Sequence, residues 1–427
     1  MIEKIIEGSA KNKFLVFLMV VFLSAAGVWA LKSTPLDAIP DLSDVQVIVY
    51  TTWMGRNPTI MEDQVTYPIV TTMISAPKVK FVRGFSDFGF SYVYIIFEDG
   101  TDIYWARSRV LEYLNQVSGR LPKGVTPTLG PDATGVGWVF QYALVDETGK
   151  YDLAQLRSLQ DWYLRYQIGS VDGVAEVASL GGFVRQYQVN LDPNRLSAYR
   201  LSVKSVVDAI RMSNNDVGGR SVELSGAEYM VRGRGYIKSI KDIEMIAVGS
   251  DGRGTPILVR DIGRVALGPD MRRGIAELDG KGQVVGGIVV MRYGENALNL
   301  IDRVKKKLKE IEPSLPPGVK IVTAYDRSDL ILRSIATLKE KLIEESLIVS
   351  AVCLIFLFHV RSALVAILTL PIAILISFIA MYYLNLTSNI MSLGGIAIAI
   401  GAMVDAAIVM VENAHKRLEK WEEGGRR

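Results

Sequence analysis

The chain has 427 residues, 49% of them hydrophobic and 22% charged, and 48 Lys and Arg against 45 Asp and Glu leave a net charge of +3. This balance excludes the strongly basic surface of a nucleic-acid-binding protein. The single cysteine, Cys353, excludes an internal disulfide and a cysteine-based zinc site. The two histidines, His359 and His415, lie near the ends of apolar runs, which excludes histidine-dependent catalysis in the hydrophilic part.

The first apolar run predicts a membrane-spanning helix. Residues 14–31 carry no charge and follow three lysines, at positions 4, 11 and 13. A span needs about 20 mostly apolar residues. The alternative is a cleaved signal peptide, but 18 uncharged residues are long for its apolar core. We therefore expect a cytoplasmic N-terminus and an uncleaved first span within residues 1–32.

Two further uncharged runs lie near the C-terminal end, at residues 346–360 and 362–404. The second of these is too long for one helix, and the polar turn 385–389 divides it. The expected segments are a second span within 336–360, a third at 363–384, a fourth at 390–412 and a tail at 413–427. Basic residues at the N-terminus, at Arg361 between the second and third spans, and in the tail place these three segments inside the cell. The hydrophilic segment between the first two spans is then extracytoplasmic.

Strand and helix patterns alternate along this hydrophilic segment. Residues 45–121 show the order β-α-β-β-α of a ferredoxin-like unit, and a second such unit begins at Trp138. A glycine-rich stretch interrupts the second unit as an inserted module. The expected strands are 45–53, 78–84, 88–97, 138–145, 174–179, 185–191, 284–292 and 319–324, and the expected helices are 57–75, 102–121, 152–169, 203–212 and 297–311. The expected domains are a first subdomain at 33–135, a second subdomain in two parts at 136–213 and 271–335, and the module at 214–270.

Asp405 lies inside the predicted fourth span. A carboxylate at the centre of a bilayer costs at least about 2.5 kcal/mol and is usually functional. Because apolar surroundings disfavour its charged form, such a group can bind and release a proton near neutral pH. We predict that Asp405 is a proton relay; the alternative is a side chain near the cytoplasmic interface that reaches water. Small residues nearby, such as Gly394 and Gly401, permit close packing of helices.

Two methionines of the same span are candidate metal ligands. Met403 and Met410 are seven residues apart, so at about 100° per residue they lie on one helix face, roughly opposite Asp405. A thioether is a soft ligand that favours Cu(I)-like ions over Zn(II). From the residues alone, ordinary packing is the commoner role of methionine, and both roles stay open. Cys353 and His359 are expected to be packing and interface residues.

Three stretches resemble one known family: Gly394–Lys416, Pro40–Val47 (PDLSDVQV) and Gly130–Trp138 (GPDATGVGW). They are similar to the heavy-metal branch of resistance-nodulation-division efflux pumps, specifically the copper/silver-exporting CusA type, and the likeness covers essentially the whole chain. The resemblance implies a secondary transporter rather than an enzyme, driven by the proton-motive force. In agreement, the sequence contains no nucleotide-binding motif G-x-x-x-x-G-K-[ST].

The resemblance also implies roles for particular residues. Asp405 corresponds to the proton-relay aspartate of the family, and Met271, Met391, Met403 and Met410 correspond to methionines of its stepwise metal relay. No cofactor is implied, since Cu(I) or Ag(I) and protons are cargo. The two subdomains would line the periplasmic pore, and residues 214–270 would be the docking module. The fold class implied is an α+β membrane protein with four transmembrane helices and a large periplasmic insert.

The same resemblance implies a multi-pass protein of the bacterial inner membrane. The implied partners are two further copies in a homotrimer, a periplasmic adaptor and an outer-membrane channel, with no nucleic acid. Members of the family are more than twice as long, so we expect the chain to be a fragment, a truncated product or one piece of a split pump. Two other functions stay open: export of divalent metals or organic compounds, and a non-transporting, membrane-anchored binding or assembly protein.

Overall fold

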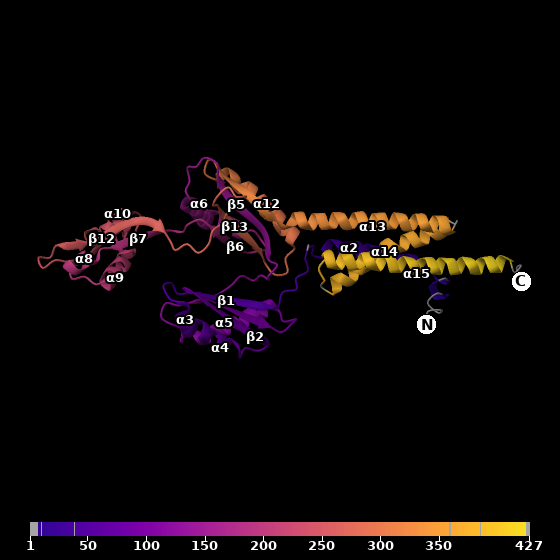
Figure 1. Ribbon diagram of the computed structural model, residues 1–427, viewed down its shortest axis with the longest axis horizontal. Coiled ribbons are helices and arrows are strands. Elements are labelled where there is room, and N and C mark those ends of the chain that lie inside the picture. The colour runs from indigo at the N-terminus through magenta and orange to yellow at the C-terminus, as the bar shows by residue number, and fades with distance from the viewer. Residues whose placement is uncertain (1–6, 10, 38, 358–359, 385, 424–427) are drawn as a thin grey trace. The chain divides into compact units, whose positions relative to one another are not determined.

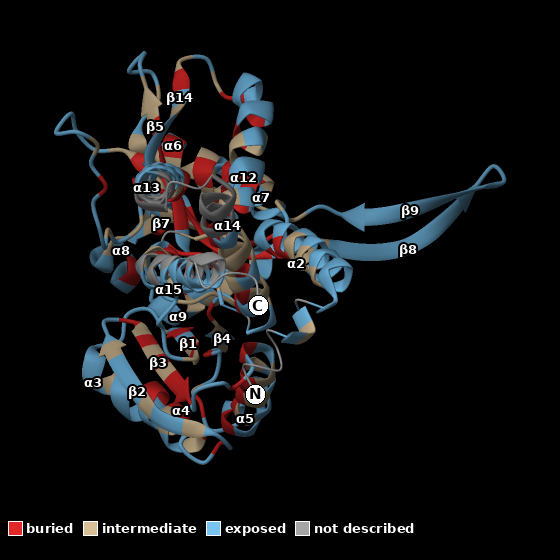
Figure 2. Cartoon of the chain, turned by 90° about the vertical axis from the view of Figure 1, so that its right-hand side faces the viewer, coloured by how far each residue is buried: buried red, intermediate tan, exposed pale blue. Residues whose placement is uncertain are grey.

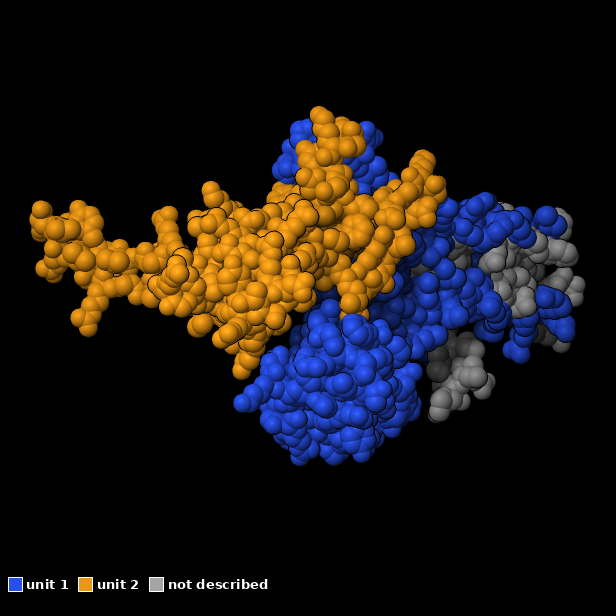
Figure 3. All heavy atoms as spheres, turned by 60° about the vertical axis from the view of Figure 1, so that its left-hand side comes forward, with its two compact units in different colours: residues 1–147, 164–179, 286–427 blue, residues 148–163, 180–285 orange. Residues whose placement is uncertain are grey.

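The computed structural model of the chain describes residues 7–9, 11–37, 39–357, 360–384 and 386–423 (Figure 1). His359 and Asn385, which the sequence places at an interface and in a turn, lie outside the described residues. The chain divides into two compact units, coloured separately in Figure 3. Unit 1 comprises residues 1–147, 164–179 and 286–427, and unit 2 comprises residues 148–163 and 180–285.

A four-stranded sheet in unit 1 has the strand order β2-β3-β1-β4. Its strands are β1 (Gln46–Thr52), β2 (Val79–Asp87), β3 (Phe90–Phe97) and β4 (Pro127–Leu129). Its helices are α3 (Pro58–Met61), the π-helix η1 (Glu62–Thr66), α4 (Tyr67–Met73) and α5 (Ile103–Ser118). In chain order the elements run β-α-β-β-α-β, with the fourth strand beside the first. The predicted ferredoxin-like unit is therefore confirmed.

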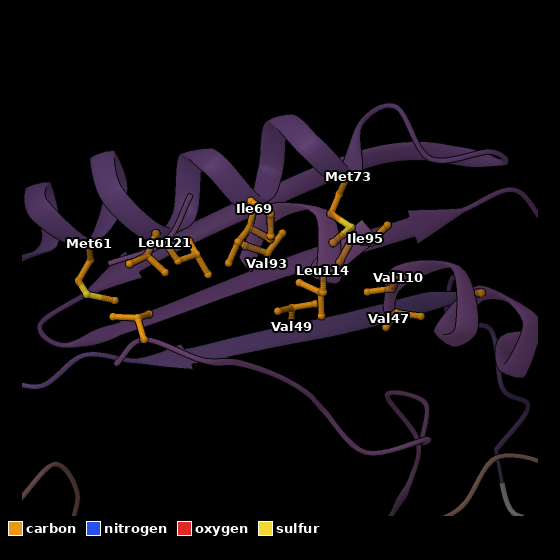
Figure 4. Close-up of a cluster of buried hydrophobic side chains, with 14 of the residues drawn as sticks. Val47, Val49, Met61, Ile69, Met73, Val93, Ile95, Val110, Leu114 and Leu121 are labelled. Atoms are coloured by element: carbon orange, nitrogen blue, oxygen red, sulfur yellow. The ribbon is translucent and has the colours of Figure 1, made fainter. Parts of the chain in front are cut away.

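The core of this sheet follows from the two-residue period of its strands (Figure 4). Alternate residues of β1 and β3 are at most 1% exposed: Val47, Val49, Val93 and Ile95. The helices add buried residues at helical spacing: Met61, Ile69, Met73, Val110 and Leu114. The start of α5 is fixed by Asp102, whose carboxylate accepts a hydrogen bond from the N–H of Trp105 (2.7 Å).

A second four-stranded sheet has the order β14-β5-β13-β6. Its strands are β5 (Trp138–Asp146), β6 (Val174–Gly181), β13 (Val285–Met291) and β14 (Val319–Asp326). The helices that follow β5 are α6 (Leu153–Leu159), the π-helix η2 (Gln160–Leu164) and α7 (Arg165–Gly169), and those that follow β13 are α12 (Ala297–Ile311) and the short η3 (Glu312–Ser314). When the four strands of each sheet are numbered in chain order, both sheets have the strand order 4-1-3-2. The second sheet therefore repeats the topology of the first, and the interruption falls between β6 and β13.

The interrupting segment builds its own core in unit 2. β7 (Arg185–Leu191) pairs antiparallel with β12 (Gly263–Pro269) along its whole length. The remaining elements are α8 (Pro193–Ala198), α9 (Val203–Ser213), α10 (Ile240–Glu244), β10 (Ala247–Ser250), β11 (Pro256–Leu258) and α11 (Val259–Ile262). The sequence pattern grouped residues 185–213 with the second ferredoxin-like unit. β7 instead pairs with β12, which lies beyond the glycine-rich stretch. Hydrophobic periodicity within one segment cannot predict such a long-range pairing. The expected domain limits stay predictions.

A hairpin of β8 (Val217–Leu224) and β9 (Ala227–Gly233) also lies in unit 2, and all residues of both strands are exposed (Figure 2). Ser225 and Gly226 form its turn with φ angles of 53° and 78°, as two-residue turns of twisted hairpins require. At its base, the N–H of Gly235 and Nε of Arg232 donate to the carboxylate of Asp216, each at 2.8 Å. These two hydrogen bonds, in that order, hold the pKa of Asp216 below its ordinary value.

Three long helices follow the second sheet in unit 1: α13 (Arg327–Leu357), α14 (Val360–Tyr383) and α15 (Ile390–Glu423). They contact one another, and α14 also contacts α2 (Lys13–Ser33) (Figure 1). Within the described residues, all four segments that the sequence predicts to be spans are thus helical.

By length and composition, α2 is the one helix among the described residues that is suited to cross a membrane, with a mean hydropathy of 2.5. Two apolar stretches in α14 and α15, Leu368–Tyr383 and Ile390–Ile400, are shorter than the about 17–25 residues of a span. The prediction of four transmembrane helices is therefore not confirmed and stays a prediction.

The helix α2 packs closely against α14. A Cβ atom at Gly27 would lie 2.5 Å from Cβ of Leu375, so only glycine fits this contact. Ala30 is 1% exposed, and the rings of Trp29 and Tyr382 meet edge to face at 4.8 Å. Small residues at a helix interface allow such an approach. This fit favours an uncleaved α2 over a cleaved signal peptide.

Candidate functional site

The helix α15 carries four of the five candidate residues. Asn389 begins the helix, because its carboxamide oxygen accepts hydrogen bonds from the N–H groups of Met391 and Ser392, both at 3.0 Å. Asp405 lies about four turns further along. The backbone of Asp405 is helical within α15, and its side chain lies outside the described residues.

The three methionines of α15 differ in their surroundings. Met403 is half-buried and packs beside Leu370 of α14 and Ile400, whereas Met391 and Met410 are 68% and 61% exposed. At a rise of 1.5 Å per residue, Met403 lies about 18 Å from Met391 and about 10 Å from Met410 along the helix axis. Since a metal–sulfur bond is about 2.3 Å long, the thioethers of Met391 and Met403, about 18 Å apart along the axis, cannot bind one ion together. These two residues can contact an ion only one after the other.

Met271 belongs to unit 2, in the loop after β12, and is 55% exposed. Its backbone N–H donates to the carboxylate of Asp270 (2.7 Å). The other three candidate methionines belong to unit 1, so Met271 shares no compact unit with them. Within the part of the chain that the structure describes, no three His, Cys, Asp or Glu side chains are placed to hold a metal ion. Metal contact by the methionines stays a prediction.

The linker 130–138, which carries part of the family resemblance, joins the two sheets and is fixed at both ends. The N–H of Gly130 donates to the carbonyl of Ile48 in β1 (2.7 Å). The N–H of Met291 in β13 donates to the carbonyl of Gly137 (2.7 Å). The linker is therefore hydrogen-bonded to the first strand of one sheet and to the end of a central strand of the other.

An acidic residue in this linker is paired from both sides. Asp132 forms an ion pair with Nε of Arg292 (3.0 Å) and accepts a hydrogen bond from the hydroxyl of Tyr104 (3.3 Å). Burial and then the charge of Asp132 raise the pKa of Tyr104 above its ordinary value. Tyr104 belongs to α5 and Arg292 follows β13, so Asp132 connects residues of both ferredoxin-like units.

Sequence reasoning missed a buried arginine at the start of α13. Arg327 is 2% exposed; its Nη2 lies 2.8 Å from Oδ1 of Asp37, and its Nη1 donates to the carbonyl of Val136. No local pattern marks these residues, because Val136 lies 191 residues away in the chain. The one signal available was a basic residue in the first turn of a helix, where the helix dipole disfavours it.

The burial and the pairing of the turn between α14 and α15 were also missed. Ser388 is 2% exposed, and its carbonyl accepts a hydrogen bond from the N–H of Asp37 (3.0 Å). Its own N–H donates to the carbonyl of Pro35 (2.9 Å). The sequence marked residues 385–389 as a polar turn but could not show that the turn pairs with the segment that follows α2.

The sequence matches the AcrB/AcrD/AcrF family over residues 5–426. Over 422 residues it is 59% identical to the putative cation efflux system protein SilA of Salmonella typhimurium and to the cation efflux system protein CusA of Escherichia coli strain K12. Each alignment covers 99% of this chain and 40% of the relative, so the chain spans about 40% of the length of these curated relatives.

The fold is similar to the crystal structure of a heavy metal efflux pump, with a TM-score of 0.85 and 33% sequence identity over 96% of this chain and 41% of that one. The resemblance inferred from the three sequence stretches is thereby confirmed. Two ferredoxin-like sheets of equal topology, the helices α2 and α13–α15, and a family match from residue 5 to residue 426 show that the chain belongs to the AcrB/AcrD/AcrF family.

Proposed function

We propose that the chain forms the N-terminal part of a proton-driven exporter of Cu(I) and Ag(I) in the bacterial inner membrane, a secondary transporter rather than an enzyme. The observation that carries this proposal is Asp405 on the helix α15 of a chain that belongs to an efflux family. A carboxyl group in an apolar helix can take up a proton on one side of the membrane and release it on the other.

Proton exchange at Asp405 would drive movement through its charge. The protonated carboxyl group is neutral and is tolerated among apolar helices, whereas the carboxylate requires a polar or charged partner. The two protonation states therefore favour different packings of α15. An ion that leaves for the periplasm in one packing, and a proton that returns to the cytoplasm in the other, give a proton/metal exchange that needs no nucleotide.

The methionines favour Cu(I) and Ag(I) as cargo. Thioethers bind soft monovalent ions in preference to Zn(II), and the spacing of Met391, Met403 and Met410 along α15 suits an ion that passes from one to the next. Two alternatives stay in view: a divalent metal or an organic compound as cargo, and a membrane-anchored protein that transports nothing.

Replacement of Asp405 by asparagine tests the proton relay. In cells that depend on the complete pump for silver resistance, Asp405→Asn is expected to abolish resistance at an unchanged amount of protein in the membrane. The matched control is Glu412→Gln on the same helix, since Glu412 is exposed and pairs with Lys416 (2.6 Å); this variant is expected to retain resistance. Silver resistance that survives Asp405→Asn would rule out the proton relay. If the unsubstituted pump itself gives no silver resistance, the result would point to the non-transporting alternative.

Replacement of methionines by leucine tests the cargo, because leucine keeps the size and removes the sulfur. Met403→Leu combined with Met410→Leu is expected to lower silver resistance and to leave zinc tolerance unchanged. Met212→Leu is the control, because Met212 is 75% exposed and is not a proposed ligand. Equal loss of silver and zinc tolerance would indicate a divalent or unselective cargo path.

We also propose a multi-pass topology with both ends in the cytoplasm, and a homotrimer that docks to a periplasmic adaptor and an outer-membrane channel. The basic N-terminus and tail support this orientation. The hairpin β8–β9 supports association with further chains, since it exposes apolar side chains to solvent along its length. These side chains are Val217, Val222, Leu224, Tyr229, Met230 and Val231, each at least 44% exposed.

A further inference from the structure

The buried ion pair of Arg327 and Asp37 is not explained by the stability of helix α13. Arginine is almost never fully buried unless it is paired, and a cation in the first turn of a helix opposes the helix dipole. Arg327 nevertheless occupies that turn with 2% exposure. Its position therefore reflects the groups it joins.

Four segments from distant parts of the chain meet at Arg327. The guanidinium contacts Asp37, which follows α2, and the carbonyl of Val136 in the linker 130–138. Asp37 in turn donates its N–H to Ser388, in the turn before α15 (3.0 Å). We name Asp37, Val136, Arg327 and Ser388 the Arg327 junction. Through it, the segment after α2, the start of α13 and the linker between the two sheets are connected, and the α14–α15 turn is attached by way of Asp37.

Each end of the Arg327 junction is attached to a larger element. On the helix side, Ser388 precedes Asn389, which caps α15 through two hydrogen bonds of 3.0 Å. On the sheet side, Val136 precedes Gly137, whose carbonyl accepts a hydrogen bond from the N–H of Met291 in β13 (2.7 Å). A shift of the α14–α15 turn can therefore be passed to the linker as long as these contacts hold.

We propose that Arg327 is a positioning residue that couples the α14–α15 turn to the linker 130–138, so that movement of α15 reaches the two ferredoxin-like sheets. Its consequence for transport rests on the function proposed above; the coupling itself does not. The charge keeps Asp37 in place through the ion pair, and the second nitrogen fixes the carbonyl of Val136 at the same time. The planar guanidinium presents two nitrogens in a fixed fork, one toward Asp37 and one toward Val136, whereas the ammonium of lysine is a point charge on a flexible stem and does not fix the two groups in one geometry.

Hydrogen exchange of the full chain in lipid vesicles tests the coupling. Asn389→Ala removes the cap of α15 and is expected to speed amide exchange in two peptides, one over residues 387–395 and one over the linker 130–138. In the Arg327→Met background, Asn389→Ala is expected to speed exchange in the first peptide only. Arg333→Met is the matched control on the same helix, because Arg333 pairs with Asp329 in an exposed position; in that background both peptides should respond.

Three outcomes overturn the proposal, two in the exchange data and one in folding. The linker fails to respond to Asn389→Ala in the otherwise natural chain, or it responds equally with and without Arg327. If Arg327→Met does not fold, Arg327→Lys and Asp37→Asn replace it, with the same loss of the linker response expected. Failure of all three variants to fold would show a purely structural role and would also overturn the proposal.

A transport readout separates this inference from the proposed function. In the complete pump, Arg327→Lys is expected to lose silver resistance at an unchanged amount of folded protein. If the natural pump gives no silver resistance, the proposed function fails while the exchange experiment still decides the coupling. If it gives resistance that Arg327→Lys retains in full, the coupling fails while the proposed function stands.

Discussion

Replacement of Ile69 by alanine is expected to loosen the first ferredoxin-like core. Ile69 lies on α4, is 0% exposed and belongs to the same cluster as Val93 and Ile95 of the sheet. The substitution removes three carbon atoms, which at about 0.8 kcal/mol each amounts to about 2.4 kcal/mol of lost transfer free energy. The cavity left behind brings the expected loss of unfolding free energy to about 2–5 kcal/mol.

Hydrogen exchange of the strand β3 measures this loss in the full chain. Its backbone amides pair with β1 and β2 on either side, so they exchange only when the sheet opens. A tenfold change corresponds to about 1.4 kcal/mol, so Ile69→Ala should speed exchange of the most protected β3 amides by roughly 30-fold to several thousand-fold. Peptides from the hairpin β8–β9 in unit 2 should not change.

Ile74→Ala is the matched control for this prediction. Ile74 lies directly after α4 and is 60% exposed, so the same deletion leaves no cavity and should alter exchange by less than about tenfold. Equal effects of the two substitutions on β3 would contradict the packing described for this core. An effect of Ile69→Ala on unit 2 would contradict the division into two compact units.

Three further predictions concern a pH dependence, a crowded glycine and the exposed hairpin. Burial would raise the pKa of Asp326, but hydrogen bonds from Lys305 and Ser328 outweigh it and lower the pKa. Asp326→Asn should therefore lower the free energy of unfolding by about 0.5–1 kcal/mol at neutral pH. Because the pKa of Asp326 is lowered in the folded chain, this difference should disappear as the pH falls through that pKa. Thermal denaturation at several pH values measures the difference, and one that persists in acid contradicts the prediction. Gly181→Ala should lower the melting temperature more than Gly226→Ala, because both glycines have positive φ but only at Gly181 would a Cβ meet a carbonyl, that of Val284, at 2.3 Å; equal shifts would show that this approach is not close. Met230→Glu, at a residue 89% exposed, should leave the melting temperature unchanged and weaken self-association in chemical cross-linking, and undiminished cross-linking would remove the hairpin from the proposed interface.

Much of the secondary structure was predictable because its signals are local. The strand β1 shows a β-branched run, and α12 shows an amphipathic period that places Leu300 and Val304 on its buried face. The repeated order of strands and helices predicted two ferredoxin-like units, and the strand order of both sheets confirms them. The pairing of β7 with β12 was not predictable, since it joins strands on either side of an inserted module.

The candidate site was predictable in part for the same reason. A carboxylate and methionines in an uncharged run are visible in the sequence alone, and helix geometry then fixes the spacing of Met403 and Met410 along α15. The sequence could not show that Met271 belongs to a different compact unit from the other three methionines.

The sequence by itself determined where the apolar helices and the ferredoxin-like elements lie, because hydrophobic period and turn residues act over short distances. It also determined the family, since the matching residues run along nearly the whole chain. Only the tertiary structure decided which distant segments meet. The contacts of Arg327 with Asp37 and Val136 join residues far apart in the chain, and burial of that charge becomes tolerable only once the fold has brought its partners together.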